Sequence, residues 1–324
     1  MTQKLWVILG IVVTVAVLFA AATVWVEHTG TNAVPGLFPP SEEGAETTFV
    51  LNATFPEIRD SYLVYKTVTP EVTSDYVKGI GRTFGLTENA ELRINDKIRL
   101  VDEAEGTRKQ VTVYKASGAI QYYKEYPASV DSQPILPSEN DAKEIASDYL
   151  STRKLLPEDA EFKNVGVSET YEIWRAGSSE PIISYDVSLA VRFSRSVNGL
   201  PVYGHDELAV IIGNNSEVHE IVMNWRAIEP YREISLKTPE EAYKELIAGE
   251  NRVQPPLEMM ADRATINEIS IGYWMEPRIT KQDFVLPVYA FTGTVIDSEG
   301  REEPFHDYVL AVQAEELESL GVVY

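Results

Sequence analysis

Cysteine is absent from this chain of 324 residues, and histidine occurs only four times. Without thiols the protein has no disulfide framework, no thiolate nucleophile, no Cys-ligated zinc or iron–sulfur centre and no lipidated cysteine anchor. Four histidines leave little material for imidazole metal sites or general bases. The sequence therefore predicts no metal site and no cofactor.

Positive charge is also scarce. The chain carries 28 Lys and Arg residues against 50 Asp and Glu residues, a formal net charge of −22. Because phosphate binding draws most of its affinity from Lys and Arg, this balance argues against a nucleic-acid partner. Hydrophobic residues make up 44% of the chain, which is enough for buried cores, and the length is typical of about two domains.

No complete catalytic motif is present. His219-Glu220 begins like the zinc motif HExxH, but Met223 stands where the second histidine is required. Ser151 and Lys154 fit SxxK, although Ser151 lies near the end of a predicted helix rather than at its start. We interpret His205-Asp206-Glu207 as a solvated polar turn. The sequence thus predicts a protein that is not an enzyme, and it leaves calcium binding open at one acidic cluster, Asp297, Glu299, Glu302 and Glu303.

An uncharged apolar run extends from Leu5 to Val26. It exceeds the roughly 20 residues that a helix needs to cross a bilayer. Lys4 precedes the run and glutamates follow it, so we expect a cytoplasmic amino terminus, a single-pass membrane anchor and an extracytoplasmic remainder. The alternative is a cleaved signal peptide, for which Ala20-Ala21-Ala22 offers a cleavage site. Outside the membrane, Asn52 and Asn214 fit the glycosylation acceptor pattern.

Beyond the run, helix-like and strand-like segments predict an α+β fold, with a transmembrane helix followed by tandem modules of a helix plus an antiparallel sheet. We divide the chain into a cytoplasmic stub and anchor (1–26), a stalk (27–47), and three modules (48–135, 136–235 and 236–324). Predicted helices cover residues 73–86 and begin after caps at Ser138 and Thr238. Predicted strands cover residues 49–55, 62–69, 92–101, 109–114, 119–126, 165–174, 183–194, 200–203, 207–212, 218–228, 266–274, 285–296 and 308–312.

Turn chemistry and aromatic residues mark two further features. Asn198-Gly199 is a turn dipeptide that permits positive φ, and Pro201-Val202 starts the next strand, so we interpret these residues as fold determinants. Three tryptophans occupy similar places near predicted strand ends and are candidates for lining a groove: Trp174, Trp225 and Trp274. Aromatic residues are equally favoured in cores, and we expect most of them to pack a helix against a sheet.

The second module contains SENDAKEIASDYL, a strand ending in Asn198-Gly199-Leu200-Pro201-Val202, and a hairpin of two valine-rich strands. This order resembles the PepSY family. In the third module, KTPEEAYKELIAGE followed by INEISIGYW and FVLPVYAFTG is similar to the later part of the YycI and YycH proteins. The resemblance covers residues 136–312. The YycI and YycH proteins are single-pass membrane proteins whose outer domains regulate a sensor kinase, so the resemblance implies the same arrangement here. PepSY-like modules also occur in propeptides that inhibit metalloproteases. The resemblance therefore implies that the partner could equally be a protease.

We therefore expect a non-enzymatic, membrane-anchored extracytoplasmic protein that binds and modulates a partner envelope protein. The alternative is a structural envelope scaffold that self-associates or attaches to a surface layer, and the oligomeric state stays open. Because PepSY-like modules present sheet edges to partner strands, we also expect the strand Glu207 to Ile212 to be an exposed edge.

Overall fold

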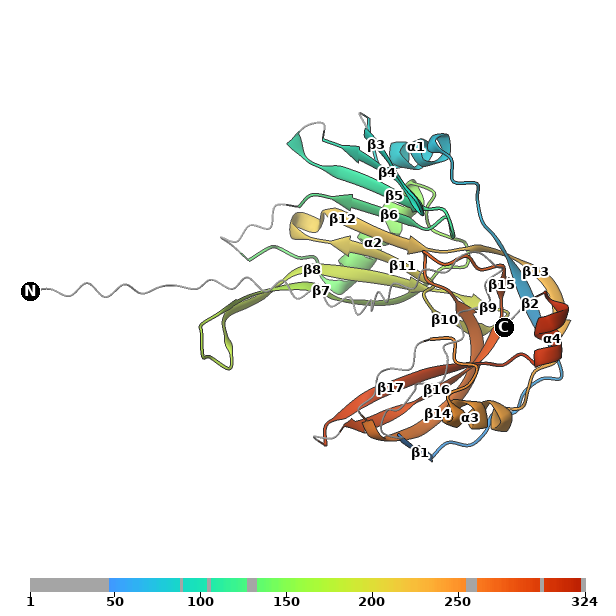
Figure 1. Ribbon diagram of the computed structural model, residues 1–324. Coiled ribbons are helices and arrows are strands. Elements are labelled where there is room, and N and C mark those ends of the chain that lie inside the picture. Colours follow the sequence, from blue (N-terminus) through green and yellow to red (C-terminus); the bar gives the residue numbers. More distant parts are fainter. Residues whose placement is uncertain are drawn as a thin grey trace, which may run out of the picture.

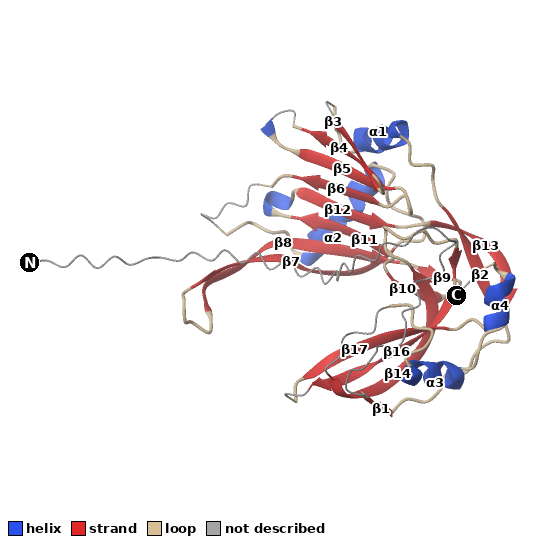
Figure 2. Cartoon of the chain, viewed as in Figure 1, coloured by secondary structure: helices blue, strands red, loops and turns tan. Residues whose placement is uncertain are grey.

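The computed structural model describes residues 47–87, 90–103, 106–126, 133–254, 261–297 and 300–321. The predicted anchor Leu5 to Val26 and all of the predicted stalk except its last residue lie outside these ranges. No helix within them is long and apolar enough to cross a membrane. The described chain mixes helix and sheet, with strands predominating (Figure 2).

The described residues contain four α-helices: α1 (Ser74–Thr83), α2 (Glu139–Thr152), α3 (Pro239–Ala248) and α4 (Ala314–Ser319). Both predicted caps are confirmed, because the hydroxyls of Ser138 and Thr238 accept backbone N–H groups of the first turns of α2 and α3. Helix α2 ends at Thr152. Lys154 adopts a φ of 56°, and the Leu155 amide donates back to the Leu150 carbonyl, which closes the helix.

The largest sheet has eight strands, and each neighbouring pair is antiparallel. One of its faces packs against α1 and α2 around a single apolar core. In spatial order the strands are β3 (Ala90–Ile94), β4 (Lys97–Asp102), β5 (Lys109–Tyr114), β6 (Ile120–Lys124), β12 (Val218–Asn224), β11 (Glu207–Ile212), β8 (Pro181–Ser194) and β7 (Glu161–Trp174).

A second sheet has six strands and packs against α3. Its spatial order is β17 (Glu302–Leu310), β16 (Pro287–Asp297), β14 (Ala261–Met275), β10 (Leu200–Gly204) and β9 (Ser196–Val197), and β1 (Thr48–Leu51) also pairs with β14. A third sheet consists of β13 (Ala227–Ile234), β2 (Tyr62–Val68) and β15 (Phe284–Val285). Figure 1 shows the two larger sheets one above the other, with the small sheet and α4 on the side where they meet.

Sheet pairing links segments that are far apart in the sequence. Strand β12 pairs with β6, so the predicted division at residue 135 is crossed by a continuous hydrogen-bonded sheet. The predicted edge at Glu207–Ile212 is wrong, because β11 pairs with β12 on one side and with β8 on the other. The edges of the eight-stranded sheet are β3 and β7 instead.

Three predicted strands are interrupted. Residues 92–101 form two strands, β3 and β4, that turn at Asn95-Asp96. Residues 218–228 break at Trp225-Arg226, and residues 285–296 break at Leu286, where the chain enters a different sheet. The last two breaks carry buried or half-buried residues, so the hydrophobic pattern runs through them without a turn signal.

The hairpin of β7 and β8 projects beyond the sheet (Figure 1). Strand β8 pairs with β11 only through Leu189–Phe193, whereas its earlier residues pair with β7 alone. We call residues 170–186 the arm. Trp174, Ile182 and Ile183 are 39%, 55% and 44% exposed on it, so the arm buries little of its own apolar surface.

Candidate functional site

The chain passes between sheets at three short breaks that meet at one junction. Arg195 separates β8 from β9, His205-Asp206 separates β10 from β11, and Trp225-Arg226 separates β12 from β13. The strands on the two sides of each break belong to different sheets. The side chains in these breaks therefore decide how the sheets are held together.

Arg195 is the centre of this junction and is only 3% exposed. Its Nε and Nη2 donate to the two carboxylate oxygens of Asp206 at 2.6 and 2.7 Å, and Nη2 also donates to the Arg226 carbonyl at 2.9 Å. Burial raises the pKa of Asp206, and the Arg195 guanidinium opposes that rise. Such a bidentate pair fixes orientation as well as charge, so it ties the first two breaks to the third.

Arg226, 1% exposed, ties the junction to the segment between β14 and β15. Its guanidinium donates to the carbonyls of Glu276, Pro277 and Thr280 at 2.6, 2.9 and 2.8 Å. Glu276 is itself buried and accepts the Trp274 indole N–H at 2.7 Å. Burial raises the pKa of Glu276 to about 7, although Trp274 and Arg226 favour its ionised form.

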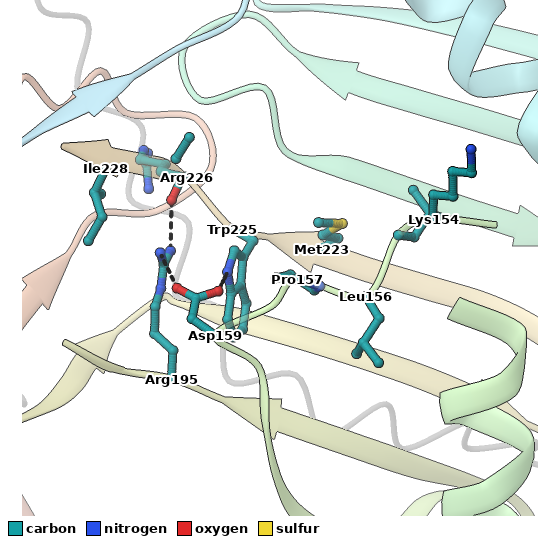
Figure 3. Close-up of a pocket in the computed structure, with 11 residues that line it drawn as sticks. Lys154, Leu156, Pro157, Asp159, Arg195, Met223, Trp225, Arg226 and Ile228 are labelled. Carbon is teal, nitrogen blue, oxygen red and sulfur yellow. Dashed lines mark hydrogen bonds and ion pairs between the residues drawn. The ribbon is translucent and has the colours of Figure 1, made fainter. Parts of the chain in front are cut away.

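A surface hollow of about 390 Å³ opens beside this junction. Apolar side chains form most of its wall, and Lys154 and Asp159 are its exposed charged residues. The lining consists of Lys154, Leu155, Leu156, Pro157, Asp159, Arg195, Met223, Trp225, Arg226, Ala227 and Ile228 (Figure 3). The segment after α2 supplies one side, and the end of β12 with the start of β13 supplies the other.

Trp225 and Asp159 connect the hollow to the ionic junction. The Trp225 indole N–H donates to one Asp159 oxygen at 3.0 Å, and Arg195 Nη1 donates to the other at 3.3 Å. The Arg195 guanidinium also lies 4.6 Å from the centre of the Trp225 ring. Figure 3 shows Asp159 between these two side chains. The carboxylate is thus engaged within the protein, and the open wall offers mainly apolar contact and an aromatic ring.

The structure does not bring the three candidate tryptophans together. Trp225 lines the hollow, whereas Trp174 lies at the exposed end of the arm. Trp274 is 2% exposed and packs against Tyr308 in the core, so it lines no groove. The three tryptophans differ in exposure because the end of β14, which carries Trp274, is buried, whereas Trp174 at the end of β7 and Trp225 just after β12 are not fully covered. The position of a tryptophan along its predicted strand does not reveal this.

The predicted turn is confirmed in its geometry. Asn198 and Gly199 have φ angles of 53° and 75°, and they join β9 to β10. Pro201 pairs with Ser196 of β9, while Val202 pairs with Tyr273 of β14. All four predicted residues therefore lie in a hairpin that docks onto the six-stranded sheet.

The remaining candidate residues lie elsewhere. Asn52 is exposed and its amide donates to Asn267 at 3.3 Å, whereas the Asn214 side chain accepts the Ile135 amide at 2.8 Å. Asp297 accepts the backbone and Nε of Arg301 at 2.8 and 2.6 Å. Across the described ranges, no group of three or more acidic or histidine side chains is placed to hold a metal ion; Glu299 of the acidic cluster lies outside those ranges.

The sequence interpretation missed the ionic junction. The predicted solvated turn at His205-Asp206-Glu207 is wrong for Asp206, whose side chain is 1% exposed. One feature of the sequence could have indicated the junction: each short gap between strands contains a charged residue. These residues are Arg195, Asp206 and Arg226. Polar and charged residues are also typical of exposed turns, so the sequence does not show that these three gaps lie together in the interior.

No family model and no curated protein matches the chain. Among solved structures, an uncharacterized protein from Eubacterium rectale ATCC 33656 is 10% identical with a TM-score of 0.46, covering 81% of this chain and 87% of that chain. The YpeB C-terminal domain of Bacillus megaterium is 14% identical with a TM-score of 0.36, covering 72% of this chain and 98% of that chain. At these TM-scores neither likeness assigns a function, and the PepSY resemblance stays a prediction.

Proposed function

We propose that the protein is a non-enzymatic, membrane-anchored extracytoplasmic binding protein that modulates a partner envelope protein, a sensor kinase or a protease. The apolar run Leu5 to Val26 supports the anchor, and the resemblance of residues 136–312 to PepSY-like and YycI-like proteins supports the class of partner. The observation that carries the binding role is the hollow beside Trp225.

The hollow has the composition of a docking site for an apolar side chain. Leu155, Leu156 and Met223 are partly exposed in its wall, and Trp225 presents an aromatic surface held rigidly by Asp159 and Arg195. Aromatic residues fixed at the centre of a contact carry a large share of binding energy. Asp159 and Arg195 pair with each other beside these residues, so a partner buries mainly apolar surface there, and Lys154 is the exposed cation in the wall.

Filling the hollow tests this proposal. Ala227 is exposed and lines it, so Ala227→Trp fills the space without removing a junction hydrogen bond. Ala90→Trp places the same side chain on the exposed start of β3, at the far edge of the eight-stranded sheet, and is the matched control.

Each full-length variant is used for affinity capture from gently solubilised membranes, and the recovered proteins are identified by mass spectrometry. We expect a stoichiometric partner with the unaltered chain and with Ala90→Trp, and a loss of about tenfold or more with Ala227→Trp. Equal recovery by both variants contradicts a role for the hollow. Absence of any partner contradicts the modulator proposal.

The arm favours the second candidate, an envelope scaffold. Trp174, Ile182 and Ile183 expose apolar surface on a two-stranded ribbon, and such surface is a typical contact between copies of one chain. A scaffold predicts self-association that Ile182→Ser with Ile183→Ser abolishes, measured by analytical ultracentrifugation of the full chain in detergent. A monomer at all concentrations contradicts it.

A further inference from the structure

The face of the eight-stranded sheet opposite α1 and α2 carries two acidic side chains beside a buried floor. Glu169 on β7 lies opposite Ser188 on β8, while Ala190 on β8 pairs with Ile211 on β11, and Ile211 pairs with Glu220 on β12. Ser188, Ala190 and Ile211 are 0%, 0% and 4% exposed. We call Glu169, Ser188 and Glu220 the acidic site; it lies near the base of the arm.

Among the described residues, neither the Glu169 nor the Glu220 carboxylate forms an ion pair with a Lys, Arg or His side chain. Burial raises the pKa of Glu169, and the negative charge of Glu220 adds to the rise. Within the described part of the chain, the Glu169 side chain makes no hydrogen bond, and the Glu220 side chain accepts one, from the Gln121 amide at 3.0 Å. Burial also raises the pKa of neighbouring Glu207, and the cations Arg192, Arg278 and Lys163 oppose that rise.

Ser188 provides an independent sign of an unfilled site. Its side chain is completely buried, yet its Oγ has no hydrogen-bond partner in the structure. Strand alternation places Ser188 on the same face as Ala190, away from α1 and α2 and beside Glu169. Buried hydroxyls in folded proteins are nearly always hydrogen-bonded, so an orphan hydroxyl beside Glu169 indicates a missing hydrogen-bond partner.

We propose that the acidic site binds a cationic side chain, the ammonium of a lysine or the guanidinium of an arginine, from a basic segment of a protein partner. The N–H groups of such a cation donate to the Glu169 and Glu220 carboxylates and to Ser188 Oγ. Tyr123 pairs with Glu220 across β6 and β12, so its ring lies on the same face, where an aromatic ring attracts a cation.

The ligand set favours an organic cation over a metal ion. Two carboxylates and one hydroxyl are fewer than the six to eight oxygen ligands that calcium takes, and no metal-holding group of acidic or histidine side chains occurs in the described ranges. The inference rests on the proposed function, because it names the chemistry of the partner. The acidic site lies on the opposite face of the sheet from Met223 of the hollow, so it adds a second contact surface.

The test compares two double variants with the same change in charge. Glu169→Gln with Glu220→Gln removes both carboxylates of the acidic site, whereas Glu302→Gln with Glu303→Gln removes two exposed carboxylates at the start of β17. The probe is a fluorescein-labelled hexalysine peptide, and its affinity for the full chain in mild detergent is measured by fluorescence anisotropy. A hexapeptide of acetylated lysines is the uncharged control.

We expect the acidic-site variant to bind hexalysine about tenfold or more weakly than the unaltered chain, and the β17 variant to bind it within about twofold. Ser188→Ala is expected to weaken binding several-fold while the protein stays folded. Equal weakening by the two double variants overturns the proposal, because it reflects only long-range attraction to an acidic protein. No binding by the unaltered chain also overturns it.

Failure here is distinguishable from failure of the proposed function. If hexalysine does not discriminate between the variants but Ala227→Trp still abolishes partner capture, only the acidic site is wrong. If free spermidine displaces hexalysine and partner capture does not depend on Glu169 and Glu220, the site takes a small polyamine and the inferred protein partner is wrong.

Discussion

The ionic junction and the acidic site both hold charged side chains at least partly away from water, and they differ in how the charge is compensated. At the junction, Arg195 donates hydrogen bonds to both carboxylate oxygens of Asp206, and Arg226 donates to three backbone carbonyls. At the acidic site, Glu169 and Glu220 face each other's charge with a single neutral donor, Gln121. The hydrogen bonds of the junction therefore hold the sheets together, whereas the acidic site keeps the unpaired carboxylate and hydroxyl on which the proposed cation binding rests.

The largest expected effect comes from breaking the junction. Arg195→Met leaves Asp206 buried without its partner, so we expect the free energy of unfolding to fall by about 3–5 kcal/mol. Urea denaturation of the full chain in mild detergent measures it. The control is Arg93→Met, which removes an exposed ion pair with Glu91 and is expected to cost at most about 1 kcal/mol. Equal effects of the two changes contradict a structural role for the junction.

A smaller effect is expected from the buried carboxyl of Glu276. Its folded-state pKa of about 7 lies above the ordinary value of 4.5, so the folded protein holds the proton more tightly than the unfolded chain does. The contribution to stability is present below pH 4.5 and is lost as the pH rises toward 7, by up to about 1.4 kcal/mol per pH unit. We expect Glu276→Gln to remove this part of the pH dependence.

Unfolding measured between pH 4.5 and pH 7.5 tests the expectation for Glu276. The amide introduced by Glu276→Gln retains an oxygen for the Trp274 N–H, so the contact itself survives the substitution. Glu302→Gln, at an exposed position, is the control and should follow the unaltered chain. If Glu276→Gln also follows the unaltered chain, the carboxyl does not hold a proton near neutral pH.

The smallest effect is expected at the acidic site, and its sign is opposite to that at the junction. Because Glu169 is partly buried beside another carboxylate, Glu169→Gln should raise the free energy of unfolding at pH 7 by about 0.5 kcal/mol. Thermal unfolding at pH 7 measures the change. A loss of stability instead means that Glu169 supports the fold, and the contrast between the two places then disappears.

Local features of the fold are predictable from the sequence because each depends on nearby residues. The helix caps at Ser138 and Thr238 and the left-handed turn at Asn198-Gly199 occur where the sequence places them. Strand Lys109–Tyr114 also matches its predicted range. In each case the side chain satisfies or permits its own backbone within a few residues.

Sheet membership is not predictable in the same way. Residues 218–228 form one apolar run, but β12 ends at Asn224 and β13 begins at Ala227 in another sheet. Trp274 and Trp225 are alike in sequence position, yet one is in the core and the other lines the hollow. Exposure depends on what packs above a strand, and that comes from distant parts of the chain.

The amino-acid sequence by itself determined the acidic charge, the absence of thiol chemistry, the apolar run at the amino terminus and the start of each capped helix. These follow from composition and from hydrogen bonds that span a few residues. Only the tertiary structure decided that Arg195, Asp206 and Arg226 form one ionic junction, and that Glu169, Ser188 and Glu220 lie on one sheet face. Both arrangements require strands distant in sequence to pair in a particular register, and that register results from packing of the whole chain.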